Sequence, residues 1–247
     1  FRALGYKCGL ISTVEMRIGQ RTIPSTHTTP DAVRLNAILA EMVAEPFLHD
    51  CRQTLTENGV LVISPSATNP QVTERGLWNT FRTCGRDDIQ GQYAANFVVD
   101  NNVAKKIAIL HDKTAYGKGL ADEFKKQLNA RGVEEVLYEA ITAGDKDFTA
   151  LITKLKEAGV ELIYLGGYHT EAGLITRQAH EQGLSAKMMS GDALVDKQYW
   201  EITGPTGEGT MMTFAPDPRK KATAADVVAE FKAAGYDPEG YTLYTYA

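Results

Sequence analysis

Several features that would assign a function class directly are scarce in this sequence or missing from it. Its 247 residues include three cysteines and five histidines, and none of them has the spacing of a zinc site or a thioredoxin-type redox centre. The formal net charge is -5, which argues against nucleic acid or an anionic membrane as a partner. No apolar run is long enough to span a bilayer. The sequence therefore predicts no metal site.

The common enzyme signatures are missing as well. There is no phosphate-binding Gly-x-x-x-x-Gly-Lys-Ser/Thr loop, no His-Glu-x-x-His and no Gly-x-Ser-x-Gly turn. Residues 116–122 resemble a dinucleotide-binding turn, but Asp122 stands where the third glycine is required. His169 could act as a general base, although a surface loop residue is the better reading. We predict a protein that is not an enzyme, with no catalytic residues and no cofactor.

What the sequence does contain is a regular alternation of strand-like and helix-like segments. Apolar, β-branched runs predict strands at residues 60–63, 105–110, 135–142, 161–165, 187–189 and 210–214. Apolar residues three or four apart predict helices at residues 30–45, 89–98, 120–131, 148–158 and 174–182, three of which should end at Gly132, Gly159 and Gly183. Such alternation predicts an α/β fold with mainly parallel, doubly wound sheets. The four consecutive aliphatics at 60–63 predict a strand covered on both faces.

Two breaks in the pattern predict two lobes. Residues 85–88 (Gly-Arg-Asp-Asp) and 215–218 (Ala-Pro-Asp-Pro) bracket a central block of uniform character. We therefore predict that residues 1–85 and 216–247 form lobe 1, that residues 86–215 form lobe 2, and that a hinge joins them. Thr223 and Asp226 have the spacing of a capping box, which predicts a helix start there. Residues 1–29 show no sustained period and support no prediction.

Polar side chains follow four of the predicted strands directly. Because parallel strands end at one edge of a sheet, and open α/β sheets bind ligands at that edge, we expect these side chains to meet. Hydroxyls suit a carboxylate, a carboxylate suits an ammonium group, and tyrosine rings supply apolar walls. Each residue alone could be an ordinary loop residue, but their joint position favours a binding site. The residues are Ser66, Thr68, Tyr116, Tyr168 and Asp192.

Residues 63–70, 81–88, 144–148 and 240–247 resemble the branched-chain amino acid-binding proteins of ABC importers. The resemblance covers residues 55–247. It implies a type I periplasmic binding protein fold, whose two lobes close on a ligand. It also implies that Ala67 and Thr68 bind the amino-acid head group, that Tyr116 and Tyr168 line the cleft, and that Asp192 binds the ammonium group.

The resemblance has further implications for the covalent structure and extent of the chain. It implies a disulfide between Cys8 and Cys51, which would leave Cys84 free. The family's first strand, loop and helix are not found in residues 1–29, and residues 51–54 replace an expected serine-rich loop. Further family strands would follow Ala247. The fold is therefore expected to be incomplete at both ends.

The resulting hypothesis is a periplasmic or extracytoplasmic receptor, monomeric, that captures a small, branched-chain amino acid and delivers it to an ABC permease. One alternative is a ligand-sensing domain of the same fold that regulates a partner. A second alternative is an enzyme on a doubly wound scaffold, since fold alone does not decide function. The strand-end loops supply one acid and no base or nucleophile pair, which favours the receptor.

Overall fold

The computed structural model describes residues 9–11, 15–18, 21–24, 56, 57, 59 and 61–245. The predicted helix at 30–45 and the predicted Cys8–Cys51 disulfide lie outside the described residues. The chain divides into two compact units. The N-terminal unit comprises Phe1–Val62 and Leu77–Asn79, and the C-terminal unit comprises Ile63–Gly76 and Thr80–Ala247.

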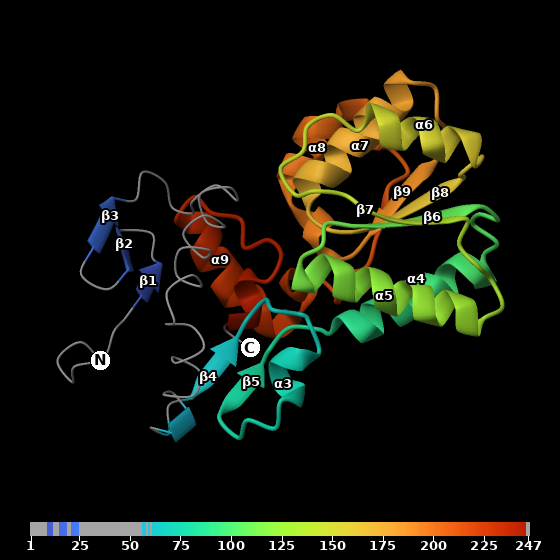
Figure 1. The fold of residues 1–247 in the computed structure, drawn as a ribbon. Coiled ribbons are helices and arrows are strands. Elements are labelled where there is room, and N and C mark those ends of the chain that lie inside the picture. Colours follow the sequence, from blue (N-terminus) through green and yellow to red (C-terminus); the bar gives the residue numbers. More distant parts are fainter. Residues whose placement is uncertain are drawn as a thin grey trace. The chain divides into compact units, whose positions relative to one another are not determined.

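The described residues contain strands, α-helices and 3-10 turns (Figure 1). The strands are β1 (Gly9–Ile11), β2 (Glu15–Ile18), β3 (Arg21–Pro24), β4 (Val62–Ser64), β5 (Thr80–Arg82), β6 (Ile107–His111), β7 (Leu137–Ala140), β8 (Leu162–Gly166), β9 (Lys187–Ser190) and β10 (Met211–Met212). The helices are α3 (Gln71–Glu74), α4 (Asp87–Asp100), α5 (Ala115–Ala130), α6 (Thr149–Glu157), α7 (His169–Glu181), α8 (Lys197–Thr203) and α9 (Ala225–Ala233). The 3-10 turns are η2 (Asp192–Val195), η3 (Gly204–Gly207), η4 (Pro218–Lys220), η5 (Ala222–Ala224) and η6 (Thr242–Thr245).

In the N-terminal unit, β1, β2 and β3 form an antiparallel sheet in that order. The register pairs Leu10 with Arg17, and Arg17 in turn with Thr22. The same unit holds Asn79, whose carbonyl oxygen accepts a hydrogen bond of 2.7 Å from the amide of Val62.

The prediction of a covered strand at residues 60–63 is wrong for the described residues. Strands β4 and β5 form a two-stranded sheet of their own, and the side chains of Ile63 and Phe81 are 54% and 50% exposed. The reason is that α4 to α8 pack on a different sheet, as described next. A run of aliphatic residues indicates a strand, but it does not identify what covers that strand.

The C-terminal unit is built on a five-stranded sheet in the order β10-β9-β8-β6-β7. All four of its strand pairs are parallel. The first of these strands in the sequence, β6, lies between β7 and β8, so the winding reverses there. Reversal points of this kind, at the carboxyl ends of the strands, are where doubly wound sheets bind ligands. The prediction of a parallel, doubly wound α/β fold is confirmed.

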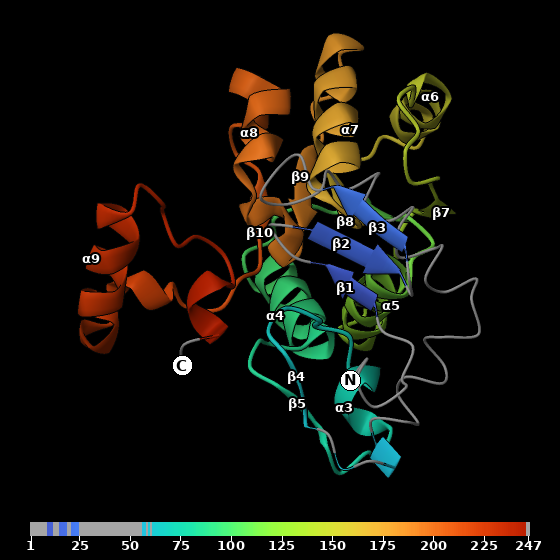
Figure 2. The same ribbon diagram turned by 90° about the vertical axis from the view of Figure 1, so that its left-hand side faces the viewer.

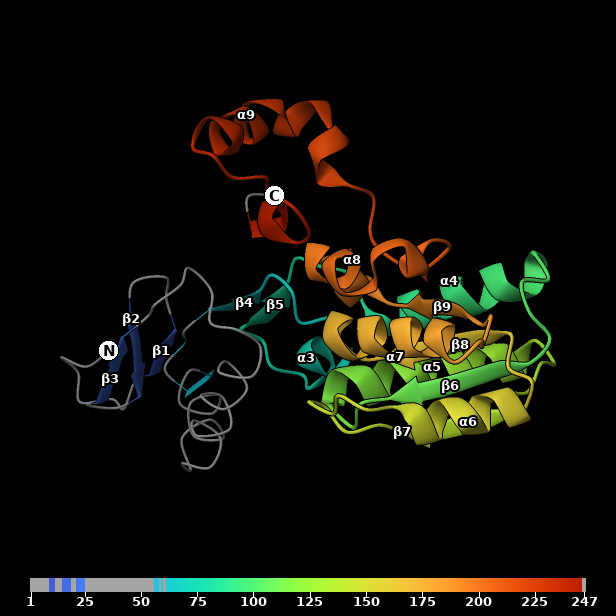
Figure 3. The ribbon, with the colours of Figure 1, turned by 90° about the horizontal axis from the view of Figure 1, so that it is seen from above.

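Helices cover both faces of this sheet. Helices α6, α7 and α8 lie side by side over one face, as Figures 1 and 3 show, and α4 and α5 lie side by side on the other (Figures 1 and 2). We name these groups the α6–α8 layer and the α4/α5 layer. Successive residues of a strand point to opposite faces. Accordingly Ile109 packs in the core of the α4/α5 layer, and Leu110 packs in the core of the α6–α8 layer.

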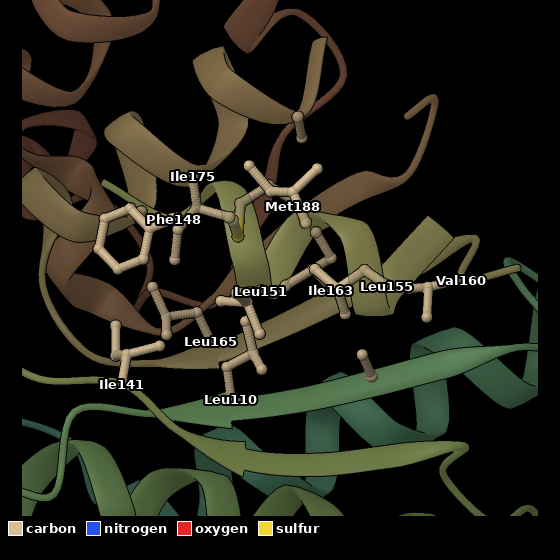
Figure 4. Close-up of a cluster of buried hydrophobic side chains, with 14 of the residues drawn as sticks. Leu110, Ile141, Phe148, Leu151, Leu155, Val160, Ile163, Leu165, Ile175 and Met188 are labelled. Carbon is tan, nitrogen blue, oxygen red and sulfur yellow. The ribbon is translucent and has the colours of Figure 1, made fainter. Parts of the chain in front are cut away.

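The core of the α6–α8 layer is made of bulky apolar side chains (Figure 4). Phe148, Leu151 and Leu155 of the loop and helix α6 meet Ile175 of α7 and Leu165 of β8 there. The helices end at the glycines that the sequence predicts. Gly132, Gly159 and Gly183 follow α5, α6 and α7 with φ values of 79°, 65° and 72°, a backbone conformation that glycine adopts without steric cost.

Helix α4 buries a different face from the one that its bulky residues indicate. The predicted stripe consists of Ile89, Tyr93, Ala94, Phe97 and Val98. Of these, Ala94 and Val98 are buried, but Ile89, Tyr93 and Phe97 are 47%, 68% and 47% exposed. The buried side is lined by small residues, among them Gly91 and Ala94. A Cβ atom on Gly91 would lie 2.8 Å from the backbone nitrogen of Phe124, so α4 and α5 approach more closely than large side chains would allow.

Helix α9 begins later than the predicted capping box requires. It starts at Ala225, and its N-cap residue Ala224 provides no side-chain hydrogen bond. Thr223 instead belongs to η5. Among the described residues, no helix combines the length and apolar character needed to cross a membrane.

Candidate ligand-binding site

The carboxyl ends of β6, β8 and β9 carry three of the predicted site residues. Tyr116 is the second residue of α5, which follows β6, and Tyr168 is the N-cap residue of α7, which follows β8. Asp192 is the first residue of η2, which follows β9. The strand order places β6 and β8 at the reversal point of the sheet and β9 beside them, so the three residues share one edge.

The Asp192 carboxylate is held by neutral hydrogen-bond donors. Its Oδ1 atom accepts a hydrogen bond of 3.0 Å from the Tyr116 hydroxyl and one of 2.8 Å from Nε2 of Gln90. Asp192 does not cap η2, because Gly191 is the N-cap residue and no side-chain cap is formed. A Cβ atom on Gly191 would lie 2.6 Å from Leu120 and 3.0 Å from the Tyr116 hydroxyl. The glycine therefore permits the approach of the β9 loop to α5.

Tyr116 and Tyr168 form an aromatic wall beside this carboxylate. Their ring centroids are 5.2 Å apart, at an interplanar angle of 44°. Burial raises the pKa of Tyr116 well above its ordinary value, and Asp192 adds to the effect. Burial, with a contribution from Asp112, raises the pKa of Tyr168 to about 12. Both phenols are therefore neutral at physiological pH and can donate hydrogen bonds.

The loop after β4 carries the other predicted site residues, of which Ser66 and Ala67 are exposed and Thr68 is buried. The amide of Ala67 donates a hydrogen bond of 3.1 Å to the Ser64 hydroxyl. The Thr68 hydroxyl is hydrogen-bonded to the Asp87 carboxylate, and the Thr68 carbonyl accepts from the Asp87 amide at 3.0 Å. These hydrogen bonds connect the loop to α4 and to the end of β4.

Two further contacts fix that loop. One guanidinium nitrogen of Arg82 donates to the carbonyl oxygens of Ala67 and Asn69, at 3.0 and 2.7 Å. The side-chain amide of Asn69 donates to the carbonyl oxygen of Ala115 at 2.8 Å. Because Ala115 immediately precedes Tyr116, this last bond connects the loop to the aromatic wall.

Asp87 and Gln90 belong to the site although the sequence reasoning missed them. Asp87 is fully buried, and its Oδ2 atom makes no hydrogen bond with a described residue. Burial raises the pKa of Asp87 to about 7; the Thr68 hydrogen bond opposes this shift and Asp192 adds to it. The available signal was their spacing, since residues three apart on a helix share a face. In the sequence, Asp87 indicates only a domain boundary, at residues 85–88.

Tyr241 was also missed. Its ring contacts that of Phe214, with centroids 5.0 Å apart. Burial raises the pKa of Tyr241, and the Asp192 carboxylate adds to the effect. Tyr241 lies within residues 240–247, one of the stretches that carries the family resemblance. The sequence therefore offered a signal for it, although no strand end precedes it.

The described part of the chain holds no group of three or more His, Cys, Asp or Glu side chains that could bind a metal ion. It includes one of the three cysteines, Cys84, which is half-buried and whose pKa is raised by burial. The predicted disulfide stays a prediction. The chemistry of the site is recognition: a carboxylate held by neutral donors and flanked by aromatic rings suits a small molecule that carries an ammonium group.

Comparison with known proteins gives one family. The profile of the periplasmic binding proteins matches residues 37–247. A Leu/Ile/Val-binding protein homologue of Brucella suis is 57% identical over 195 residues, which are 79% of this chain and 53% of the homologue. An amino acid binding protein of Pseudomonas aeruginosa is 52% identical over 193 residues, or 77% of this chain and 52% of that protein. The chain spans about half the length of the curated relatives that it matches.

Solved structures agree with these relatives. A leucine-binding protein of Thermotoga maritima has a TM-score of 0.72 at 28% identity, over 78% of this chain and 56% of that one. The substrate-binding protein of a branched-chain amino acid transporter from Streptococcus pneumoniae, solved in complex with isoleucine, has a TM-score of 0.68 at 28% identity over the same shares. Both likenesses concern the fold and the arrangement of its strands.

Proposed function

The chain belongs to the periplasmic binding protein family. We propose that, outside the cytoplasm, it captures a small amino acid, most favourably a branched-chain one, and delivers it to the permease of an ABC importer. The relatives support this proposal by their names: a Leu/Ile/Val-binding protein homologue, a leucine-binding protein, and a substrate-binding protein solved in complex with isoleucine. The observation that carries it is the Asp192 carboxylate, held at the ligand edge of the sheet by Tyr116 and Gln90.

We assign the roles of the site residues as follows. Asp192 accepts charge-assisted hydrogen bonds from the ammonium group of the ligand. Its partners Tyr116 and Gln90 are neutral, so neither of them forms an ion pair with Asp192 in place of the ligand. Ser66, Ala67 and Thr68 bind the ligand's carboxylate. The Ser66 hydroxyl is exposed, whereas the Ala67 amide and the Thr68 hydroxyl must first give up their hydrogen bonds to Ser64 and Asp87. Tyr116 and Tyr168 enclose the ligand with their rings. None of these roles includes a chemical step, so the protein acts by binding and release.

The proposed motion follows from the family. Lobe 1 (residues 1–85 and 216–247) and lobe 2 (residues 86–215) would close on the ligand by rotation about residues 85–86 and 214–216. Hinges commonly consist of a few residues at the ends of secondary-structure elements. The protein would act as a monomer. Small-angle scattering with and without saturating isoleucine should show a more compact particle when ligand is present.

Replacing one side chain tests the carboxylate directly. Removing one partner of a buried, hydrogen-bonded charge pair costs about 2–5 kcal/mol, so Asp192→Asn should weaken amino-acid binding by roughly 30-fold or more. Calorimetric titration with leucine, isoleucine and valine measures the effect. The matched control is Asp196→Asn, because Asp196 caps α8 through the amide of Gln198 at 2.8 Å and asparagine caps equally well. Its affinity should equal that of the wild type.

Three outcomes would contradict the proposal. If the wild-type protein binds none of these amino acids, the ligand class is wrong. If Asp192→Asn binds them as the wild type does while its melting temperature falls, Asp192 has only a structural role. Turnover of an amino acid or amide by the wild type would show that the protein is an enzyme.

A further inference from the structure

The side chain of Gln90 joins three segments that lie far apart in the sequence. Its Oε1 atom accepts hydrogen bonds from the amide of Asp192 at 3.0 Å and from the hydroxyl of Thr213 at 2.8 Å. Its Nε2 atom donates to Oδ1 of Asp192 at 2.8 Å and to Oδ1 of Asp87 at 3.3 Å. A glutamine amide has two donor hydrogens and two acceptor lone pairs. All four are used, so the side chain is fixed in one orientation.

The position of these partners matters for binding. Asp87 is the first residue of α4, directly after Arg86 in the first predicted hinge segment. Thr213 directly precedes Phe214 in the second hinge segment, and Asp192 is the proposed ligand carboxylate. A single buried side chain therefore connects the ligand carboxylate to both predicted crossings between the lobes.

We propose that Gln90 is a positioning residue for ligand binding, which holds the Asp192 carboxylate in place without neutralising it and ties that carboxylate to both hinge segments. This inference rests on the proposed function. The chemistry requires a neutral donor. A lysine or arginine at this position would form an ion pair with Asp192 and compete with the ligand's ammonium group, and a glutamate would add a third carboxylate beside Asp87 and Asp192.

The role of Gln90 can be tested by measuring how the affinity of a Gln90→Glu variant depends on pH. Gln90→Glu preserves the shape of the side chain. At about pH 8 the new carboxylate is ionised and repels its neighbours, whereas at about pH 5.5 burial beside the Asp192 carboxylate favours its protonated form. In that form the introduced carboxyl group can donate to Asp192 as the amide does. Besides Asp87 and Asp192 themselves, the ionisable groups that interact electrostatically with one or both of them are Asp88, Arg82, Cys84, Tyr116, Tyr164, Tyr168 and Tyr241.

The measured quantity is the affinity of each variant for isoleucine, divided by that of the wild type at the same pH. Because both proteins contain the same neighbouring ionisable groups, the effect of their titration on affinity cancels in this ratio. Because a hydrogen bond to a charged group contributes about 1.5–3 kcal/mol, Gln90→Glu should bind about 10-fold more weakly or worse at pH 8. This deficit should shrink at pH 5.5. Gln90→Leu, which cannot form these hydrogen bonds, should show a similar deficit at both pH values. Gln92→Glu is the matched control, since Gln92 is an exposed residue of the same helix.

The possible results separate the inference from the proposed function. A wild-type protein that binds none of leucine, isoleucine and valine overturns both. If the wild type binds, wild-type affinity in Gln90→Glu at pH 8 overturns the role of Gln90 alone. A deficit of Gln90→Glu that is equal at the two pH values also overturns it, because a merely structural defect would not be rescued by protonation. Rescue in Gln90→Glu and no change in Gln92→Glu supports it.

Discussion

The two helical layers of the five-stranded sheet differ in whether their buried polar groups have hydrogen-bond partners. In the α6–α8 layer the buried hydroxyl of Tyr199 has two partners, Thr176 at 3.2 Å and Thr210 at 2.6 Å. Three buried side-chain oxygens make no hydrogen bond with a described residue: Oδ2 of Asp87 and the hydroxyl of Tyr164, both in the α4/α5 layer, and Oδ2 of Asp112, directly after β6. All residues of the central strands β6 and β8, which lie between the two layers, are buried.

This difference follows the position of the site. Asp87, Gln90 and Tyr116, which surround Asp192, all belong to helices of the α4/α5 layer. A buried polar group without a partner costs free energy, and proteins tend to break such rules of local consistency at functional sites. We infer that the α6–α8 layer chiefly stabilises the five-stranded sheet, whereas the α4/α5 layer is less stable because it holds Asp192, the proposed ligand carboxylate.

The largest effect expected from this comparison concerns Asp87. Its pKa of about 7 in the folded protein exceeds that of an unfolded aspartate, about 3.9. Between these values the folded state binds more protons, so the free energy of unfolding falls as pH rises. From pH 5 to pH 8 this group should lower it by about 2–3 kcal/mol. In Asp87→Asn this decrease should be absent, as denaturant unfolding at several pH values would show.

The neighbouring Asp88 provides the control. The Arg86 side chain lowers the pKa of Asp88 through two hydrogen bonds, so this carboxylate is ionised in both states from pH 5 to pH 8. Asp88→Asn should therefore keep the wild-type slope in that range. If the free energy of unfolding of Asp87→Asn depends on pH as that of the wild type does, Asp87 is ionised in the folded protein despite its burial.

Much of the scaffold could be predicted from the sequence because its signals are local. Strand-like runs and stripes with a helical period located β6 to β9 and α4 to α7, and glycines fixed the ends of three helices. The strand-end rule placed Tyr116, Tyr168 and Asp192 at one edge. These predictions depend on neighbours in the chain, or on a topology that such alternation almost always adopts.

What escaped prediction depends on distant neighbours. The buried face of α4 follows from the close approach of α5 to Gly91, which hydrophobic periodicity does not indicate. Gln90 is an ordinary polar residue in the sequence, and only the fold brings it to Asp192 and Thr213. The exposure of Ile63 likewise depends on which sheet the helices cover. Roles that need a contact across many residues were therefore missed.

A second test compares two buried glycines, one in each layer. A Cβ atom on Gly91 would lie 2.8 Å from the backbone of Phe124, whereas one on Gly173 would lie 2.8 Å from the side-chain methyl Cγ2 of Ile202. Backbone cannot yield as a side chain can. Gly91→Ala should therefore destabilise by about 1–2 kcal/mol, because overpacking of about 1–3 kcal/mol exceeds the helix-propensity gain of about 0.5–1 kcal/mol.

In Gly173→Ala a rotamer change can move Cγ2 of Ile202, and its Cβ atom, 3.0 Å away, needs only a small shift of α8. Stability should therefore stay within about 1 kcal/mol of the wild type. Denaturant unfolding of both variants gives the comparison. If the two variants lose equal amounts of stability, the helices of both layers are packed equally tightly and the layers do not differ in packing.

The smallest effect concerns two buried tyrosine hydroxyls. Tyr164 stacks on Phe124, with ring centroids 3.7 Å apart, and its hydroxyl lacks a partner among the described residues. Removing an unsatisfied buried polar group relieves a desolvation cost, so Tyr164→Phe should raise the free energy of unfolding by up to about 1 kcal/mol. Tyr199→Phe should lower it by about 1 kcal/mol, because the hydroxyls of Thr176 and Thr210 would each lose a partner. A loss of stability in Tyr164→Phe, largest at low pH, would instead indicate that the Tyr164 hydroxyl is hydrogen-bonded to protonated Asp87, and that the α4/α5 layer satisfies its polar groups as fully as the α6–α8 layer does.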